Sequence, residues 1–381
     1  MICLKVFKQS GERKLHGVNK MENKINTYFF DLIKVAVEEK DTLSGMPTPD
    51  EWIAIYTLAK EHTLEGILFS AIEKLPKEQR PPRPILLKWF AATEIIQQKN
   101  RIVNADAVKM CETIKNDGLR CVILKGQGIA TYYPNPSLRQ SGDIDLWIEG
   151  GAKRVLDYLR SKGPVTNIVY THLDAEVPVD TEVEIHHNPT FFYNPLFLNR
   201  LHKYLNEQDE IFDNYVDLLG GTGKICIPTL EFNRYFIILH IYRHYFSEGI
   251  GLRQLMDYYY VLKKEGTNES KQRTLEMFKK TGMMKFVAAT MWVMKQVFGM
   301  EERYMLCTPN EKAGKKLMEE VMLSGNFGKY DKRIDWTKHH KLLHRVWSSI
   351  RRKTRFVIDY PQEIIFDIPM RLYMYIWKHF I

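Results

Sequence analysis

Cysteine is sparse in this 381-residue chain, and long apolar runs are missing. The cysteines are widely spaced, odd in number and form no Cys-x-x-Cys pair, which argues against a disulfide framework and against a structural zinc site. We expect isolated, reduced thiols at Cys3, Cys111, Cys121, Cys226 and Cys307. No apolar stretch approaches the roughly 20 residues of a membrane-spanning helix, and the N-terminal residues contain no run of signal-peptide type. A folded, water-soluble, cytoplasmic protein is therefore expected.

Internal repeats and low-complexity segments are also missing, and the formal charge of +9 is unevenly distributed. Residues 1–20 have a net charge of +4 and residues 338–356 one of +7, so the rest of the chain sums to −2. Residues 1–20 show no helical or strand period and are interpreted as a disordered tail or an upstream start-codon extension. The second basic segment is consistent with binding to RNA, an anionic surface or an acidic partner, but a solvated helix face with apolar residues inward is the favoured interpretation.

The periodicity of apolar residues divides the chain into helical and mixed regions. Residues 21–117 have a helical pattern, and Thr48-Pro49-Asp50-Glu51 forms a capping box before Trp52. Between about 118 and 190 we expect strands at 120–124, 143–148, 167–171 and 181–187, with a crossover helix at 152–161. Further helices are expected at 229–246, 252–264, 271–281, 285–298 and 310–323, the last begun by a second capping box, Thr308-Pro309-Asn310-Glu311. The tail should be helical, with a break near Tyr360-Pro361 and an aromatic end that docks on the body.

These patterns predict an α+β protein, in which a small mixed sheet is flanked by a larger, mostly helical part. The expected divisions are a tail (1–20), an N-terminal helical region (21–117), a mixed-sheet core (118–190), a C-terminal helical domain (191–337) and a basic, aromatic helical tail (338–381).

Paired acids alternate with apolar residues on two of the expected strands. Asp143 and Asp145 are two apart, so both carboxylates point to one face, with Cα atoms about 7 Å apart. Two anions on one face repel unless a cation lies between them. If the strand with Glu182 and Glu184 pairs beside the first, a third carboxylate lies about 5 Å across the ladder. Three acids can hold two Mg²⁺ ions; Glu184 is our choice for the third ligand, and Glu182 is the reserve.

A glycine turn precedes the first acidic strand. Gly126 and Gly128 would let backbone amides approach an anion at a helix N-terminus, and Lys125 and Arg139 would supply positive charge for a triphosphate. Taken alone, each element is a weak signal. The order of glycine turn, short helix, D-x-D strand and third acidic strand is more specific.

These residues resemble the nucleotidyltransferases of the DNA polymerase beta superfamily, and within them a family of uncharacterised bacterial nucleotidyltransferases. The resemblance rests on Leu124-Lys125-Gly126, Arg139, Asp143-Ile144-Asp145 and Val183-Glu184-Ile185-His186, followed by Leu239-His240, His244, Gly251-Leu252-Arg253 and Asp257. It covers about residues 90–265. It implies a transfer of a nucleoside monophosphate from a nucleoside triphosphate to an unknown acceptor, dependent on Mg²⁺ or Mn²⁺, with pyrophosphate released. One departure concerns the glycine turn: Gly126 is followed by Gln127 and lies farther from the first acid than the superfamily pattern has it.

Several residues near the motifs have alternative interpretations. His240 and His244 lie on one helix face and are either metal ligands or structural. Arg253 and Asp257 are interpreted as an intrahelical ion pair, with a wall of the active site as the alternative. His186 should contact the site beside Glu184, whereas His187 should point away.

Two other functions stay open at this point. A D-x-D motif also binds manganese and a nucleotide-sugar in many glycosyltransferases, although those enzymes usually have a nucleotide fold upstream of the motif. A non-catalytic module that binds a nucleotide or a partner on the same fold is the other alternative.

Overall fold

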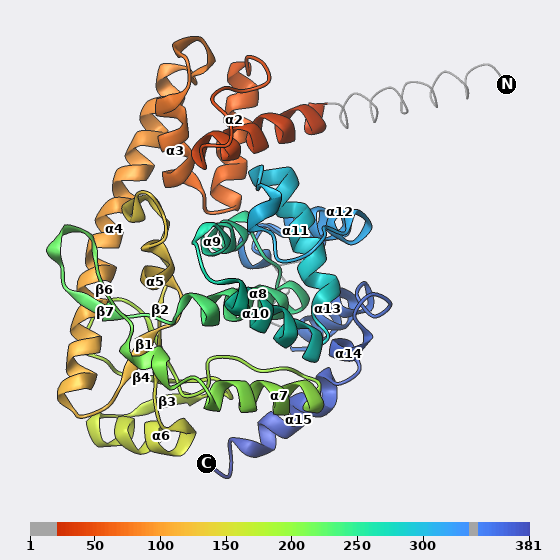
Figure 1. The fold of residues 1–381 in the computed structure, drawn as a ribbon. Helices are drawn as coiled ribbons and strands as arrows, with labels where there is room; N and C mark the ends of the chain where they lie inside the picture. The colour runs from red at the N-terminus through yellow and green to blue at the C-terminus, as the bar shows by residue number, and fades with distance from the viewer. Residues whose placement is uncertain (1–20, 335–341) are drawn as a thin grey trace.

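The computed structural model describes residues 21–334 and 342–381, and these form a mixed α and β fold (Figure 1). A five-stranded sheet and a two-stranded ribbon lie among a majority of helices. The α+β class with a small mixed sheet is confirmed. The described cysteines, Cys111, Cys121, Cys226 and Cys307, are free thiols. None of the described helices combines the length and the apolar character that crossing a membrane requires. The tail predicted for residues 1–20 falls outside the described residues.

The main sheet has the strand order β1-β2-β5-β4-β3. Its strands are β1 (Cys121–Ile123), β2 (Ile144–Ile148), β3 (Val165–Ile168), β4 (His172–Ala175) and β5 (Val183–His186). Only β2 and β5 run parallel, and the other pairs are antiparallel. The strand expected at 167–171 is wrong in its limits, because the chain turns after Ile168 and returns as β4. The ribbon of β6 (Tyr215–Asp217) and β7 (Lys224–Cys226) was not predicted.

The helices follow the predicted periodicity closely. After a helix at 21–36 the described α-helices are α2 (Pro49–Glu61), α3 (Glu65–Lys74), α4 (Arg83–Asn116), α5 (Gly126–Ala130), α6 (Gly151–Lys162), α7 (Pro195–Asn206), α8 (Leu230–Ser247), α9 (Leu252–Lys263), α10 (Asn268–Lys280), α11 (Met284–Phe298), α12 (Glu311–Ser324), α13 (Leu342–Thr354), α14 (Pro361–Ile364) and α15 (Asp367–Trp377). The break expected at Tyr360-Pro361 is confirmed, because α14 begins at Pro361.

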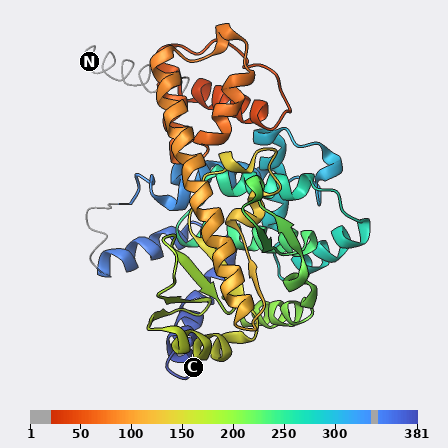
Figure 2. The same cartoon turned by 90° about the vertical axis from the view of Figure 1, so that its left-hand side faces the viewer.

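Helix α4 connects the N-terminal helices to the sheet. Its 34 residues extend about 51 Å along one side of the molecule (Figures 1 and 2). Near its start Trp89 packs in the large helical core, and toward its end Ala107 and Ile114 pack in the core under the sheet. Between them, the buried Asn100 donates hydrogen bonds to the carbonyl oxygens of Ser137 and Arg139, at 2.6 and 2.8 Å. The helix thereby fixes the loop that leads into β2.

The two faces of the sheet differ in chemistry. On one face the apolar side chains of β2 and β5 pack against α4 and α6; they are Ile144, Leu146, Ile148, Val183 and Ile185. The opposite face carries Asp145, Glu184 and His186 and is covered in part by α8, where Phe232 lies 6.1 Å from Trp147 between ring centroids. The acidic side chains therefore lie between the sheet and the helical part.

The two predicted capping boxes have different outcomes. Thr48 caps α2 as expected, since its hydroxyl accepts from the Glu51 amide and the Glu51 carboxylate accepts from the Thr48 amide. The capping box predicted at Thr308 is wrong. The side chain of Asn310 caps α12 by accepting from the Ala313 amide, at 3.0 Å, because the helix starts two residues later than a Thr308 cap would place it.

The C-terminal segment packs on the body through both charged and aromatic side chains. Arg352 is buried and donates to the Tyr245 carbonyl oxygen, and Lys353 pairs with the buried Asp367. These two side chains are therefore not part of a solvated helix face. Residues 338–341 of the basic segment and the side chains of 342–347 lie outside the described part. Trp377 packs edge to face on Tyr170, at 5.0 Å between centroids, so docking of the aromatic end is confirmed there. Tyr375 and Phe380 are exposed.

Candidate active site

Three carboxylates meet at the start of β2. Asp143 directly precedes the strand, and the parallel register pairs Asp145 with Glu184 of β5. One carboxylate oxygen from each of these residues lies within 4.8 Å of the others. Glu182 is exposed and does not belong to this group. The structure therefore brings together the three acids expected from the sequence and leaves the reserve residue outside.

Positive groups contact Asp145 more closely than Asp143. Burial and the nearby carboxylates of Asp145 and Glu184 raise the pKa of Asp143, against a smaller opposing effect of Lys125. Burial alone would raise the pKa of Asp145 too, but Lys125 and His186 lower it overall. The Lys125 Nζ atom lies 2.7 Å from Asp145 Oδ1, and the His186 Nε2 atom lies 3.1 Å from the same oxygen. An all-oxygen group with this excess of negative charge is suited to Mg²⁺ or Mn²⁺.

The turn formed by Lys125, Gly126 and Gly128 lies beside the acids, and its two glycines are required for different structural reasons. Gly126 adopts the left-handed conformation, with φ of +49°, and begins the five-residue helix α5. Gly128 is needed for packing, since a Cβ atom there would lie 3.0 Å from Ile227 Cγ2 and 3.1 Å from the Ile123 carbonyl oxygen. The Gly128 amide donates to the Lys125 carbonyl oxygen within the turn. Phosphate binding by this turn stays a prediction, for which Lys125 and Gly126 are better placed than Gly128.

Residues 48–299 match the model of a protein family described as uncharacterised nucleotidyltransferase, a range that includes the acids and helices α2 to α11. The chain belongs to this nucleotidyltransferase family. A crystal structure described as an antigenic nucleotidyltransferase-like protein from Paracoccidioides brasiliensis is similar over 52% of this chain and 97% of that one, with 14% identity and a TM-score of 0.28. No curated protein matches the chain.

A buried ion pair joins the loop before β2 to helix α9. Arg139 donates to both oxygens of Asp257, at 2.7 and 2.8 Å, and the Tyr133 hydroxyl donates to the same carboxylate at 2.6 Å. Although burial opposes its ionisation, Arg139 lowers the pKa of Asp257 overall. Most of the charge of Arg139 is thus balanced inside the protein, and a direct contact of this residue with a triphosphate stays a prediction.

The intrahelical ion pair expected between Arg253 and Asp257 is wrong. Arg139, which lies outside α9, forms a bidentate pair with the Asp257 carboxylate. Arg253 donates to the Gln140 carbonyl oxygen at 2.9 Å. Arg253 instead lines a small cavity of about 40 Å³ together with Asp143 and Asp145. This position agrees with the alternative interpretation as a wall of the site.

The histidines near the motifs have distinct surroundings. His186 contacts Asp145 and Glu184, as expected, and these contacts raise its pKa in spite of burial. His187 points away and stacks on Trp377. The rings of His240 and His244 lie 4.4 Å apart, but among the described residues they join no group of three metal-binding side chains.

His172 is a site residue that the sequence interpretation missed. It faces His186 across the β4–β5 ladder, and its Nδ1 atom lies 3.6 Å from Glu184 Oε2. The signal that could have revealed it is the alternation of polar and apolar residues from His172 to Ala175. The single strand predicted at 167–171 leaves no place for the turn between β3 and β4, which is what brings His172 beside His186.

Two larger cavities flank the acids. One, of about 620 Å³, is lined by Glu184 and Lys125 and reaches α8 and α15; it carries four lysine or arginine side chains, Lys125, Arg243, Arg371 and Lys378, against the carboxylates of Glu184 and Glu248. The other, of about 770 Å³, lies on the Asp143 side, where four basic side chains face four carboxylates. The first cavity therefore has the stronger positive character.

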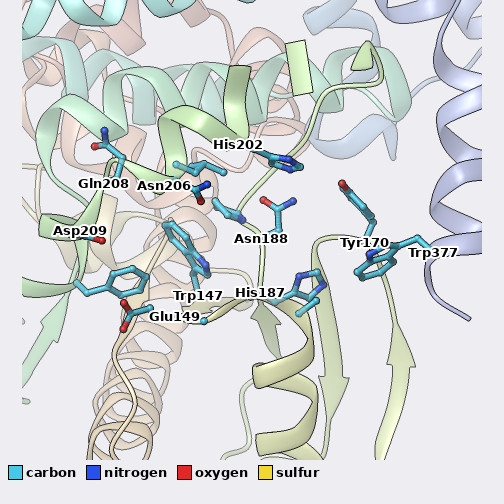
Figure 3. A pocket seen from close by; sticks show the side chains of 16 residues that line it. Trp147, Glu149, Tyr170, His187, Asn188, His202, Asn206, Gln208, Asp209 and Trp377 are labelled. Atoms are coloured by element: carbon cyan, nitrogen blue, oxygen red, sulfur yellow. The ribbon is translucent and has the colours of Figure 1, made fainter. Parts of the chain in front are cut away.

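A third cavity, of about 600 Å³, opens at the far end of β2 (Figure 3). Its walls combine aromatic rings such as Trp147 and Trp377 with the amide side chains Asn188, Asn206 and Gln208. None of the described residues that line it is a lysine or an arginine, and Glu149 and Asp209 contribute negative charge. It is therefore poorly suited to a triphosphate.

Proposed function

We propose that this chain is a metal-dependent nucleotidyltransferase of the DNA polymerase beta superfamily. In this reaction an acceptor hydroxyl oxygen forms a bond to the α-phosphorus of a nucleoside triphosphate. The bond from that phosphorus to the β-phosphate oxygen breaks, pyrophosphate leaves, and the hydroxyl proton is released to water. The observation that carries the proposal is the convergence of Asp143, Asp145 and Glu184 within 4.8 Å, in a chain whose family is shown.

We assign the metal to these three acids. When bound, Mg²⁺ or Mn²⁺ would neutralise the phosphoryl oxygens and favour ionisation of the attacking hydroxyl. Burial, together with repulsion from Asp145 and Glu184, raises the pKa of Asp143, and a bound cation would relieve the repulsion, which supports the assignment. The Lys125 ammonium already contacts Asp145 from one side and would then be shared with a phosphate oxygen.

We place the triphosphate in the cavity next to Glu184. A triphosphate brings about four negative charges, and this cavity has the larger excess of basic side chains. Lys125 lines both this cavity and the small one that contains Asp143 and Asp145, so it connects the phosphate site to the acids. The acceptor hydroxyl would then enter from the more neutral cavity on the Asp143 side.

Thermal stability measured with each nucleoside triphosphate, with and without Mg²⁺ or Mn²⁺, tests the proposal before any acceptor is known. We expect a metal-dependent rise in Tm with at least one triphosphate, and its loss in Asp143→Asn/Asp145→Asn. No shift with any triphosphate would overturn the proposal in favour of a non-catalytic module. A shift with nucleotide-sugars alone would favour a glycosyltransferase.

Activity measurements then separate the roles of single acids. With a labelled triphosphate and an acceptor found by screening, Asp143→Asn should abolish transfer while leaving the fold intact. Glu184→Gln should have a similar effect, whereas Asp157→Asn, exposed on α6 and outside the acid group, should retain wild-type rates. Wild-type transfer by Asp143→Asn would exclude our metal assignment.

A further inference from the structure

Four polar side chains, two of which belong to the acid group, form a row across three neighbouring strands. In the register of the sheet Asp145 of β2 is paired with Glu184 of β5, and His186 of β5 is paired with His172 of β4. Paired residues project from the same face with Cβ atoms about 5 Å apart. The row is therefore fixed by backbone hydrogen bonding and does not depend on a chance meeting of flexible side chains.

Two imidazoles and one carboxylate in this row lie close enough for a single ion. The Glu184 Oε2 atom is 3.4 Å from His186 Nε2 and 3.6 Å from His172 Nδ1. One ligand atom from each of the three residues lies within 4.8 Å of the others. All three side chains line the 620 Å³ cavity, so an ion held there would keep positions open toward a ligand.

We propose that His172, Glu184 and His186 bind a divalent transition-metal ion, such as Zn²⁺, Co²⁺ or Mn²⁺, at a position separate from the three acids and joined to them by Glu184. Imidazole nitrogen is a good ligand for these ions and a poor one for Mg²⁺. Two histidines and one carboxylate with open coordination positions are a donor set of catalytic metal sites. This group with two nitrogen ligands would prefer a transition-metal ion, whereas the all-oxygen group of Asp143, Asp145 and Glu184 also suits Mg²⁺.

The groups next to the three side chains favour such an ion, whereas the basic residues of the cavity, apart from Lys125, line its other walls. Asp143, Asp145 and Glu184 place three carboxylates near one ammonium group, that of Lys125. The His186 Nε2 atom lies 3.1 Å from Asp145 Oδ1 and would exchange this contact for the ion, while its Nδ1 atom is buried without a hydrogen-bond partner. The Thr171 hydroxyl lies 3.2 Å from His172 Nδ1 and would rotate away on metal binding. On the other side of that ring, Asp174 Oδ1 lies 3.6 Å from Nε2, where a carboxylate orients a ligating histidine.

Titration with Co²⁺ tests the proposal in the complete chain. The visible absorption of Co²⁺ reports its binding and coordination geometry, so no nucleotide, acceptor or activity is required. The variant Asp143→Asn/Asp145→Asn should retain a Co²⁺ site that excess Mg²⁺ does not displace. Adding His172→Ala to it should weaken Co²⁺ binding at least tenfold, a loss on the scale of removing a group that supports a metal. The half-buried His202, which lines the third cavity, gives the control His202→Ala, with unchanged binding.

Pulsed electron paramagnetic resonance of the Mn²⁺-loaded wild-type protein gives an independent readout. We expect couplings to imidazole nitrogen that are reduced in His172→Ala. Co²⁺ affinity and nitrogen couplings that are unchanged in a folded His172→Ala variant would overturn the proposal. The outcome is separate from that of the proposed function: a triphosphate shift without nitrogen ligation would refute only the histidine site, and nitrogen ligation without a triphosphate shift would refute only the transferase.

Discussion

At the scale of single residues, Asp257 shows how one carboxylate can hold two parts of the protein together. It is buried in α9 and accepts hydrogen bonds from Arg139, in the loop before β2, and from Tyr133. The loop carries Asp143 a few residues later, so the ion pair helps to fix the position of the first acid. Removing one partner of a buried pair leaves the other charge without compensation.

We therefore predict that Asp257→Asn lowers the free energy of unfolding by about 3–5 kcal/mol. Urea denaturation measures this loss, and Asp117→Asn is the control. Asp117 pairs with Lys162 at the surface, with its side chain 26% exposed, so its loss should change stability little. Equal stability of the two variants would show that the Arg139 pair is not important for the fold.

At the scale of elements, the start of α12 has two candidate N-cap residues, Thr308 and Asn310. The Asn310 side chain accepts from the Ala313 amide, whereas Thr308 lies outside the helix. Asn310→Ala should cost about 1 kcal/mol of stability, because it leaves a helix-terminal amide without an acceptor. Thr308→Ala should be neutral. Thermal denaturation of both variants distinguishes the caps, and a larger loss in Thr308→Ala would restore the capping box expected from the sequence.

Helix α15 depends on one buried carboxylate for its attachment. Asp367 accepts from Lys353 of α13 and from Arg371 of α15, and α15 in turn places Trp377 against Tyr170 and His187. Burial lowers the pKa of Lys353 despite this pairing, which indicates an ammonium group with little access to water. The helix should therefore loosen when the carboxylate is lost.

We predict that Asp367→Ala increases hydrogen exchange and protease cleavage across residues 367–377 and also lowers Tm. Glu302→Ala serves as the control, because Glu302 pairs with Lys295 at the surface, with its side chain 80% exposed. Unchanged exchange in α15 would mean that its aromatic contacts alone are sufficient to hold the helix.

At the scale of the whole molecule, buried histidines and buried carboxylates make stability depend on pH in two stages. Burial lowers the pKa of His62 to about 3 and that of His187 to about 4, so both stay neutral in the folded state. The unfolded chain binds protons at these sites below about 6.5, and the free energy of unfolding therefore falls as the pH drops below that value. The pKa of Asp257 is lowered, so its contribution is present above about 4 and is lost at lower pH.

We predict that His62 alone reduces stability by about 2 kcal/mol between pH 6.5 and 5. In His62→Gln, urea denaturation across this range should show a shallower slope, since glutamine does not titrate and its oxygen can accept from the Leu252 amide as the His62 ring does. The exposed His379→Gln should leave the slope unchanged. A wild-type slope in His62→Gln would contradict the prediction.

The sequence by itself determined the local features of this protein. Alternation with a period of two placed Asp143 and Asp145 on one face, and the 3.6-residue period located helices such as α8 and α11 within a few residues. Both patterns depend only on neighbours along the chain. This period places Glu182 and Glu184 on the same face, so the choice of Glu184 depended on the register that pairs it with Asp145.

Only the tertiary structure decided which distant residues meet. The parallel register of β2 and β5, the partner of Asp257 and the pairing of His172 with His186 join residues from 14 to 118 positions apart. Such contacts depend on how α4, the sheet and the helical part pack together, and many partners are compatible with one local pattern. Arg139 illustrates this point, because the same arginine fits either a phosphate or a buried carboxylate, and the packing of α9 brought Asp257 to it.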